Sequence, residues 1–326
     1  MERPRRALTG NLVEKLSEGD RARLFALGRS RVVEAGGELV RQGTAGDCLF
    51  IVEEGEVAVV RALPGDEEEV LIVAGAGMIL GEMSVLDGGM RAASLRAVGR
   101  CVVRVVGIGA FEALTLHGGE AGHRLLRSVA AMVHERLDAT CAAGDGSCSI
   151  VPAGASLEWS GADRYVAGLL GVLPAFASFD AADREALVPR LRVAELRRGE
   201  EVVLPHGDAP GVTMVLRGAL SPWLDDEVGP DIMRPAVGPG WFVDYAWALG
   251  LGHGTRRWRA RSPTRLLRLD AELFEVASPF AARLLYTLSR DLASTLRRAT
   301  ALRMHFEMAW AHRTRRAAPL RAVQEA

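Results

Sequence analysis

The sequence repeats itself at an offset of 163 residues, and this repeat limits the fold more than any other feature. The matching positions are Gly55 with Gly218, Gly77 with Gly240, Ala97 with Ala260, Leu49 to Val52 with Val212 to Val215, and Phe111-Glu112 with Phe274-Glu275. Several matches at one offset through one window are a stronger signal than any single match. The chain therefore reads as two copies of one fold, the second running from about residue 167 to residue 298.

Short strands separated by turns make up the first copy. The predicted strands cover residues 32–33, 38–41, 48–52, 57–60, 70–73, 92–97 and 102–106. Gly, Asp or Pro interrupts them at short, regular intervals, which is typical of a β-barrel or jelly roll. Helical patterns flank the strands at 9–28, where Ser17 or Asp20 is the expected cap, and at 111–116 and 124–140. We predict an α+β fold that is mainly β, with two tandem jelly-roll barrels, each flanked by helices.

Composition places the chain among soluble proteins of two ordinary domains. It has 326 residues, of which 49% are hydrophobic and 25% charged, and a formal net charge of −1. Lys15 is the only lysine, which excludes a Walker-type phosphate loop. No apolar run approaches the roughly 20 residues that span a bilayer, and the N-terminus does not resemble a signal peptide. We expect a cytoplasmic protein with no membrane span.

The four cysteines are too few for a disulfide scaffold, and they suggest no metal site. Cys141 and Cys148 fit no zinc spacing. His134-Glu135 begins like a zinc-protease motif, but position 138 is Asp. We therefore expect no metal, no cofactor and no enzyme activity.

Residues 81–97, GEMSVLDGGMRAASLRA, have the chemistry of an anion cradle. Gly81 lets the backbone approach a ligand closely, and a short helical turn follows it. After the reversal at Gly88-Gly89, Arg91 returns toward the same place with a guanidinium suited to phosphate oxygens. Glu82 is an odd neighbour for a phosphate unless it holds a sugar hydroxyl. Together these residues indicate a ribose phosphate.

This stretch resembles the phosphate-binding cassette of the cyclic nucleotide-binding domain family, in which Gly-Glu precedes a short helix and Arg-Ala-Ala follows. Gly81, Glu82, Arg91, Ala92 and Ala93 match at the family's spacing, and FIVEEGEV around residues 50–57 resembles its strand-turn-strand signature. The resemblance implies that Arg91 binds the cyclic phosphate and Glu82 the ribose 2′-hydroxyl. It also implies that the N–H groups of Met83 and of Ala92 or Ala93 hold phosphate oxygens.

The same resemblance assigns a role to the helix at 124–140. In the catabolite activator family, a long helix after the barrel dimerises, and its end covers the nucleotide base. By that likeness, Thr140 contacts the base, and a homodimer forms through 124–140 or through the later helical pattern at 283–298. Members that prefer cyclic GMP often place Thr or Ser directly after the Arg. Ala92 stands there in this chain, which favours cyclic AMP over cyclic GMP.

The second copy lacks these residues. At the offset of 163, Asp244, Tyr245 and Gly254 replace Gly81, Glu82 and Arg91. An Asp at the start of the cassette helix would repel an anion, and Trp241, Tyr245 and Trp247 would reshape the pocket. We interpret the second pocket as degenerate for cyclic nucleotides.

These patterns divide the chain into a cyclic nucleotide-binding domain at 1–141, a linker at 142–162, a second, degenerate copy at 163–298 and a basic tail at 299–326. The leading hypothesis is a cyclic nucleotide receptor that signals to an unidentified protein partner or within an oligomer. One alternative is a DNA-associated regulator that uses the Arg-rich tail, although no recognition helix can be named. Another is an assembly scaffold with inert barrels. Neither charge nor motif favours nucleic acid.

Overall fold

The computed structural model describes residues 13, 16–63, 65, 67–141, 157–204, 211–222, 235–243, 245–251, 256–275 and 277–321. In the first half, the elements are α2 (Glu18–Ala26), β1 (Arg29–Val33), β2 (Glu38–Val40), β3 (Cys48–Glu54), β4 (Val57–Ala62), β5 (Glu68–Ala74), β6 (Ile79–Leu80), α3 (Glu82–Asp87), β7 (Ser94–Ala97), β8 (Cys101–Gly107), α4 (Ile108–His117) and α5 (Gly119–Cys141). Two antiparallel sheets form there, in the orders β1-β8-β3-β6 and β2-β7-β4-β5.

In the second half, the elements are β9 (Ser160–Gly161), α6 (Arg164–Leu170), η1 (Pro174–Phe176), α7 (Ala181–Leu187), η2 (Val188–Arg190), β10 (Leu191–Leu196), β11 (Glu201–Leu204), β12 (Gly211–Arg217), β13 (Leu220–Pro222), α8 (Ala246–Leu249), β14 (Arg256–Ala260), β15 (Thr264–Asp270), α9 (Glu272–Glu275) and α10 (Pro279–Arg321). Its described strands form the sheets β12-β15-β10-β9 and β11-β14-β13. Antiparallel sheets with flanking helices confirm the predicted α+β class.

The two halves share one strand register at the offset of 163. Leu49 pairs with Val106 in the first half, and Val212 pairs with Leu269 in the second. The β1–β8, β2–β7 and β4–β7 pairs have the same relation to β10–β15, β11–β14 and β13–β14. Even the break in register between Val52 and Glu54 recurs between Val215 and Arg217. The second half therefore repeats the strand topology of the first.

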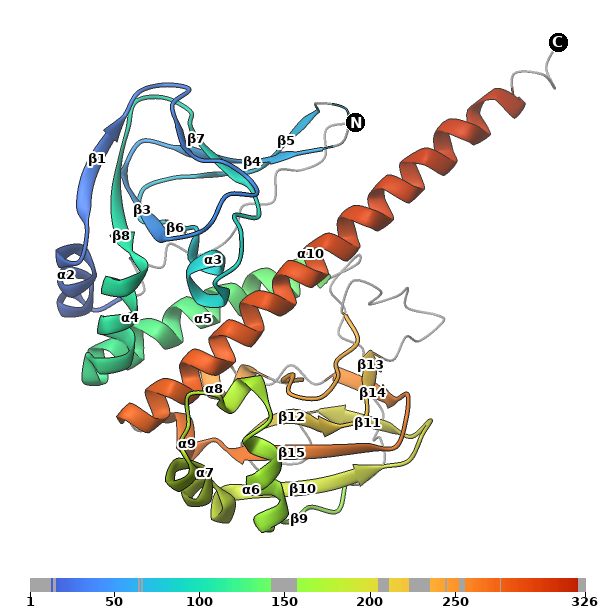
Figure 1. Cartoon of the computed structure of the whole chain (residues 1–326). Coiled ribbons are helices and arrows are strands. Elements are labelled where there is room, and N and C mark those ends of the chain that lie inside the picture. Colours follow the sequence, from blue (N-terminus) through green and yellow to red (C-terminus); the bar gives the residue numbers. More distant parts are fainter. Residues whose placement is uncertain are drawn as a thin grey trace.

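Two long helices lie between the barrels, and α10 extends beyond both (Figure 1). Each barrel has an apolar interior of its own. A third apolar cluster joins the halves, because Leu125, Val129 and Val133 of α5 pack together with Leu284, Leu288 and Leu292 of α10. All six of these side chains are at most 1% exposed. The halves therefore share a core and are not connected by a linker alone.

Several boundaries differ from those predicted. The helix expected at 9–28 is described as α2 from Glu18, with Ser17 as its cap, while residues 1–12, 14 and 15 lie outside the described residues. The short strand β6 was not predicted, since two residues give no detectable period. Within the expected linker, residues 142–156 lie outside the described residues, and β9 pairs with β10.

The expected basic tail at 299–326 is not a separate segment, because α10 continues through Arg321. From residue 299 to residue 318 the sequence contains neither Gly nor Pro, so nothing in the local chemistry ends the helix earlier. The predicted boundary at 298 therefore falls inside one helix.

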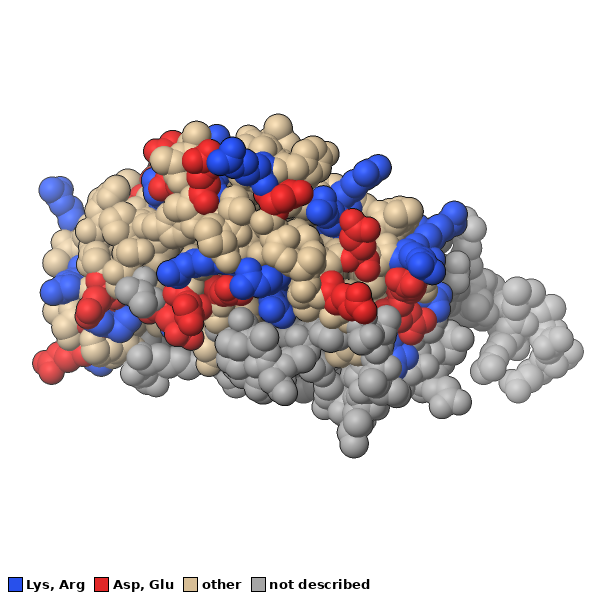
Figure 2. All heavy atoms as spheres, turned by 90° about the horizontal axis from the view of Figure 1, so that it is seen from below, with Lys and Arg blue, Asp and Glu red and all other residues tan. Residues whose placement is uncertain are grey.

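Surface charge is mixed on the face seen in Figure 2. Basic and acidic side chains alternate over the described part of that face, without a large area of one sign. Among the described residues, no helix combines the length and apolar character that crossing a bilayer requires.

Candidate functional site

Arg91 lies at the centre of the predicted cradle and is only 4% exposed. Its Nη1 donates to the Gly81 carbonyl oxygen at 3.3 Å and to the Ser84 hydroxyl at 2.9 Å. Its Nη2 contacts the Cys48 sulfur at 3.3 Å and lies 3.6 Å from the Asp47 carboxylate. Its Nε has no hydrogen-bond partner among the described residues. The structure thus buries a guanidinium with one donor unused.

The backbone of the cradle is shaped around this side chain. Gly81 has a φ of +81°, and a Cβ there would lie 2.5 Å from Nη1 of Arg91. Both the left-handed conformation and the close approach require glycine. The loop before β3 holds the other side, because the Arg91 N–H donates to the Thr44 carbonyl and the Arg91 carbonyl accepts from Gly43. Gly81 and Arg91 are therefore brought together by local packing.

Glu82, the first residue of α3, is 2% exposed and forms an ion pair with Arg136 of α5. The Arg136 Nη2 also donates to the Ile79 carbonyl at 3.3 Å. This pair connects the cassette to the long helix. A buried carboxylate needs such a partner, since an isolated buried charge is costly.

The other predicted residues differ in burial and in their hydrogen-bond partners. Met83 is partly buried against the helical core. Ala92 and Ala93 lie between Arg91 and β7, and their N–H groups have no acceptor in the part of the chain that the structure describes. Thr140 donates its hydroxyl to the Arg136 carbonyl at 2.7 Å, and its own carbonyl accepts from Arg303 at 3.4 Å. One of these two hydrogen bonds lies within α5 and the other joins α5 to α10, and neither reaches the cassette.

Ser84, Cys48 and Arg136 belong to the site but were not predicted. Ser84 sits within the cassette sequence, where only its contact with Arg91 reveals a role. Cys48 touches the guanidinium, and burial raises the pKa of its thiol, so it is not a reactive thiolate. Arg136 lies four residues before Thr140, on the same face of the helix. This spacing from a predicted site residue was the one sequence signal that could have indicated Arg136.

In the second half, the residue that corresponds to Glu82 bonds to a carboxylate of α10. Tyr245 stands at the offset position of Glu82 and is 2% exposed. Its hydroxyl donates to Asp291 of α10 at 2.5 Å, and the Phe242 N–H also donates to Asp291, at 3.2 Å. Burial raises the pKa of Asp291 to about 7. Asp244 and Gly254, which the sequence aligns with Gly81 and Arg91, lie outside the described residues.

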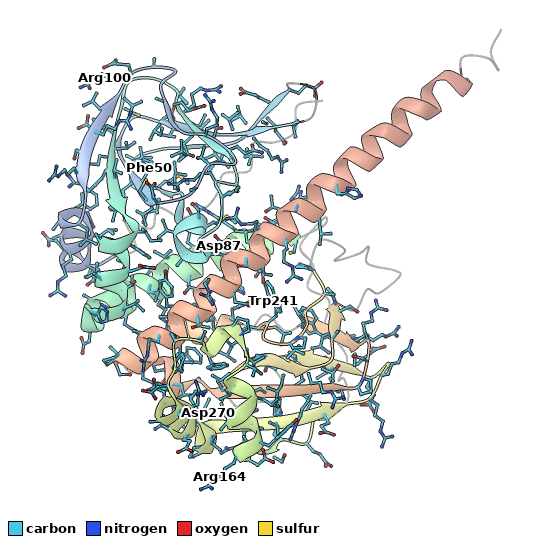
Figure 3. All side chains as sticks on the ribbon, viewed as in Figure 1. Phe50, Asp87, Arg100, Arg164, Trp241 and Asp270 are labelled. Carbon is cyan, nitrogen blue, oxygen red and sulfur yellow. The ribbon has the colours of Figure 1, made fainter. Side chains whose placement is uncertain are left out.

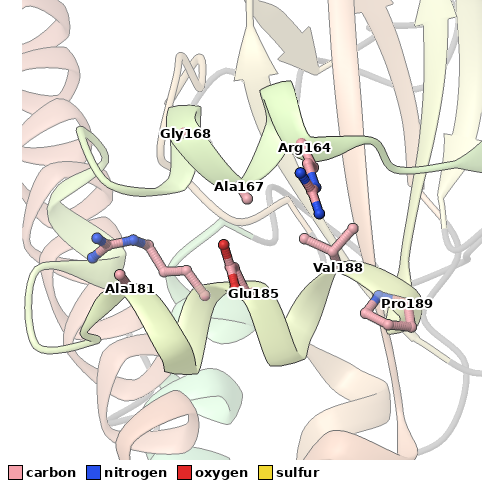
Figure 4. A pocket seen from close by; sticks show the side chains of 8 residues that line it. Arg164, Ala167, Gly168, Ala181, Glu185, Val188 and Pro189 are labelled. Atoms are coloured by element: carbon pink, nitrogen blue, oxygen red, sulfur yellow. The ribbon is translucent and has the colours of Figure 1, made fainter.

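An open cavity lies elsewhere, between α6 and the α7–η2 segment of the second half (Figure 4). Its lining residues include Arg164, Arg184 and Glu185, and it encloses about 470 Å³. It is not part of the cradle, whose charged groups are buried. Among the described residues, no group of three or more His, Cys, Asp or Glu side chains could hold a metal ion.

Comparison with known proteins gives one family and several partial relatives. The family model described as "Cyclic nucleotide-binding domain" matches residues 30–117. The "Cyclic AMP receptor protein" of Thermus thermophilus is 40% identical over 68 residues, which are 21% of this chain and 32% of that protein. An uncharacterized ABC transporter ATP-binding protein of Mycobacterium tuberculosis is 42% identical over 65 residues, 20% of each chain. The match thus spans a third or less of these relatives.

One solved structure is the N-terminal domain of a transcriptional regulator from Streptomyces coelicolor. It is 30% identical, with a TM-score of 0.36, and the match covers 43% of this chain and 98% of that one.

Proposed function

Residues 30–117 belong to the cyclic nucleotide-binding domain family, and on that premise we propose that the cradle at 81–93 binds a cyclic nucleotide and reports its presence through the long helices. The ligand class follows from the chemistry of the cradle. A cyclic phosphate carries one negative charge and two free oxygens, which suit a guanidinium. A ribose hydroxyl suits a carboxylate acceptor.

The unused Nε of Arg91 is the observation that carries the proposal. A guanidinium that is 4% exposed has lost nearly all its water, and its present partners are a carbonyl, a hydroxyl, a thiol and one distant carboxylate. Leaving a buried donor unsatisfied costs about 1–3 kcal/mol. An anion beside Arg91 would remove that cost and gain charge-assisted hydrogen bonds. The N–H groups of Ala92 and Ala93 supply further donors next to it.

Glu82 is the proposed acceptor for the sugar. Its ion pair with Arg136 fixes the position of the carboxylate, whose oxygens are the proposed acceptors for the sugar hydroxyl. The pair also transmits the occupancy of the cradle to α5. Thr140, one turn further along α5, is the proposed contact for the base.

Cyclic AMP is the proposed ligand, in preference to cyclic GMP. Ala92 follows Arg91 where a hydroxyl side chain would favour guanine, and the Thermus relative is named for cyclic AMP. We propose a single site per chain, because Tyr245 and Asp291 bond to each other in the second half. The output partner is proposed to be another protein or a second copy of this chain.

Calorimetric titration with cyclic AMP, and then with cyclic GMP, tests this function. We expect one cyclic AMP per chain, and roughly 100-fold weaker binding in Arg91→Gln, because a buried charged hydrogen-bond set is lost. Arg96→Gln is the matched control. Arg96 lies five residues further on and forms its ion pair with Glu68 on the surface, at 2.9 Å.

Two results would contradict the proposal. The absence of binding heat and of any thermal shift with either nucleotide would remove the receptor function. A stoichiometry near two would show that the second half binds as well.

A further inference from the structure

Helix α10 is fixed to the second half along one face. Arg283 forms an ion pair with Asp183 of α7 at 2.7 Å. Arg298 donates to the Ala236 carbonyl at 2.5 Å and stacks over Trp241, 4.2 Å from the ring centre. Together with the Asp291 contacts, these bonds hold α10 against the second half.

The neighbouring residue on α10, Arg297, points to the first half. Its Nε and Nη2 donate to the two carboxylate oxygens of Asp87 at 2.9 and 3.0 Å, and its Nη1 donates to the Met90 carbonyl at 2.6 Å. Asp87 is the last residue of the cassette helix, and its side chain is 5% exposed. Figure 3 shows Asp87 on one side of α10 and Trp241 on the other. One helix thus holds the cassette with Arg297 and the second barrel with Arg298.

The contact between Arg297 and Asp87 explains why residue 89 is a glycine. Gly88 has a φ of +67° and therefore needs glycine for the turn, but Gly89 is not among the residues with positive φ. A Cβ on Gly89 would lie 2.8 Å from Nη2 of Arg297 and 2.9 Å from the Asp87 carboxylate. The second glycine of the pair therefore leaves space for the arginine of α10.

The cradle is closed in this arrangement. Arg91 and Glu82, the two charged groups that would meet the ligand, are 4% and 2% exposed. The Gly81 carbonyl and the Ser84 hydroxyl, at the start of α3, already accept from Nη1 of Arg91, so a nucleotide that takes this donor displaces α3 and the turn that follows it. That movement separates Asp87 and Met90 from α10, unless the helix moves with them.

We propose that Arg297 is a positioning residue that holds the cassette closed, so that the second half controls nucleotide entry into the first. This inference rests on the proposed function. Its ligand is the cyclic nucleotide of that site, and α10 is the element that senses it. If the contact must break before the ligand binds, only the open fraction of the protein is competent to bind. The apparent affinity is then the affinity of the open form multiplied by that fraction. Because coupling is reciprocal, the ligand in turn releases α10 from the cassette.

Binding of cyclic AMP to the full chain and to Arg297→Gln is the first test. We expect the variant to bind about three- to tenfold more tightly, with faster association, since it lacks a charge-assisted bidentate contact that is partly screened by solvent. Asp87→Asn and Gly89→Ala should change affinity in the same direction. Arg290→Gln is the matched control, because Arg290 of α10 bonds to the Pro174 carbonyl in the second half and not to the cassette. A merely structural contact would lower the melting temperature without tightening binding.

Amide hydrogen exchange of residues 82–90 in the ligand-free protein provides a second measurement. We expect faster exchange in Arg297→Gln than in the wild type, and wild-type exchange in Arg290→Gln.

The restraint by Arg297 and the proposed receptor function can be disproved independently of each other. If the wild type binds cyclic AMP and Arg297→Gln binds with equal or lower affinity, the inference is wrong and the receptor function stands. If no variant binds nucleotide, the receptor function is lost, and exchange at 82–90 still decides whether α10 holds this segment. Unchanged exchange in Arg297→Gln would overturn the restraint itself.

Discussion

At the scale of single residues, the cradle depends on side chains that satisfy one another without solvent. Arg91 lies against Gly81 and Ser84, and Glu82 lies against Arg136. Each pair combines a buried charge with a group that must fit it closely. Small changes of volume or charge should therefore have large effects here.

Gly81→Ala should abolish nucleotide binding and lower stability. The added Cβ would lie 2.5 Å from the Arg91 guanidinium, at a φ of +81° that alanine adopts only with strain. We expect a loss of about 1–3 kcal/mol in the free energy of unfolding, measured by urea titration. Gly99→Ala is the control, because a Cβ at Gly99 meets nothing within 4 Å and the φ is ordinary. Wild-type affinity in Gly81→Ala would contradict this account.

Arg136→Gln should destabilise the protein by about 3–5 kcal/mol, because it leaves the carboxylate of Glu82 buried without its cation. Adding Glu82→Gln should recover much of that loss, since the uncompensated charge is then gone. Urea unfolding of both single variants and of the double variant measures the coupling. Additive losses would show that the two side chains do not interact.

At the scale of elements, α10 connects structures that are far apart in the sequence. It bonds to α4 through Tyr286 and Glu112 at 2.8 Å, to α3 through Arg297, and to the second barrel through Asp291 and Arg298. Burial raises the pKa of the Tyr286 hydroxyl, so this contact keeps its proton at every ordinary pH.

The pKa of Asp291, raised by burial to about 7, predicts a pH dependence. Between its ordinary pKa of 3.8 and about 7, the folded state holds a proton that the unfolded state has released. Stability should therefore fall as pH rises through this range and level off above it, by an amount on the order of a few kcal/mol. The facing groups are the Tyr245 hydroxyl, Arg290 and Arg298, while His134 of α5 lies against the Tyr245 ring.

Urea unfolding at pH 5 and pH 8 checks this dependence. Asp291→Asn cannot ionise, so its stability should change less between the two pH values than that of the wild type. The comparison between the two proteins is needed because burial also lowers the pKa of His123, which weakens the fold toward acid pH. An equal pH dependence in both proteins would contradict the assignment to Asp291.

At the scale of the whole molecule, the shared core of α5 and α10 makes the two halves one cooperative unit. Leu288 of α10 is fully buried in that core. Leu288→Ala should cost about 2–5 kcal/mol and lower the thermal midpoint of both halves together. Calorimetry should give one transition whose calorimetric and van't Hoff enthalpies agree. Two separated transitions would show that the halves unfold independently.

The sequence was sufficient for features that depend on near neighbours. The strands, the cassette helix and its glycine turn follow from short-range alternation and spacing, and the offset of 163 residues predicts the second set of strands. It was not sufficient for contacts between distant segments. Arg136 reaches Glu82 across 54 residues and Arg297 reaches Asp87 across 210, and no periodicity encodes such pairs. The predicted boundary at 298 was wrong for a different reason, because the helix continues through residues whose apolar pattern fades but which contain no Gly or Pro before residue 319.

The buried position of Arg91 and Glu82 also has a consequence for timing. If the cradle must open before a nucleotide can enter, the rate of capture cannot increase indefinitely with nucleotide concentration. It reaches a ceiling equal to the rate at which the cassette separates from its surroundings. A pulse of ligand that is shorter than the average time before the cassette opens is therefore bound by few molecules, however high its concentration. The protein responds to sustained rises in nucleotide and not to brief ones.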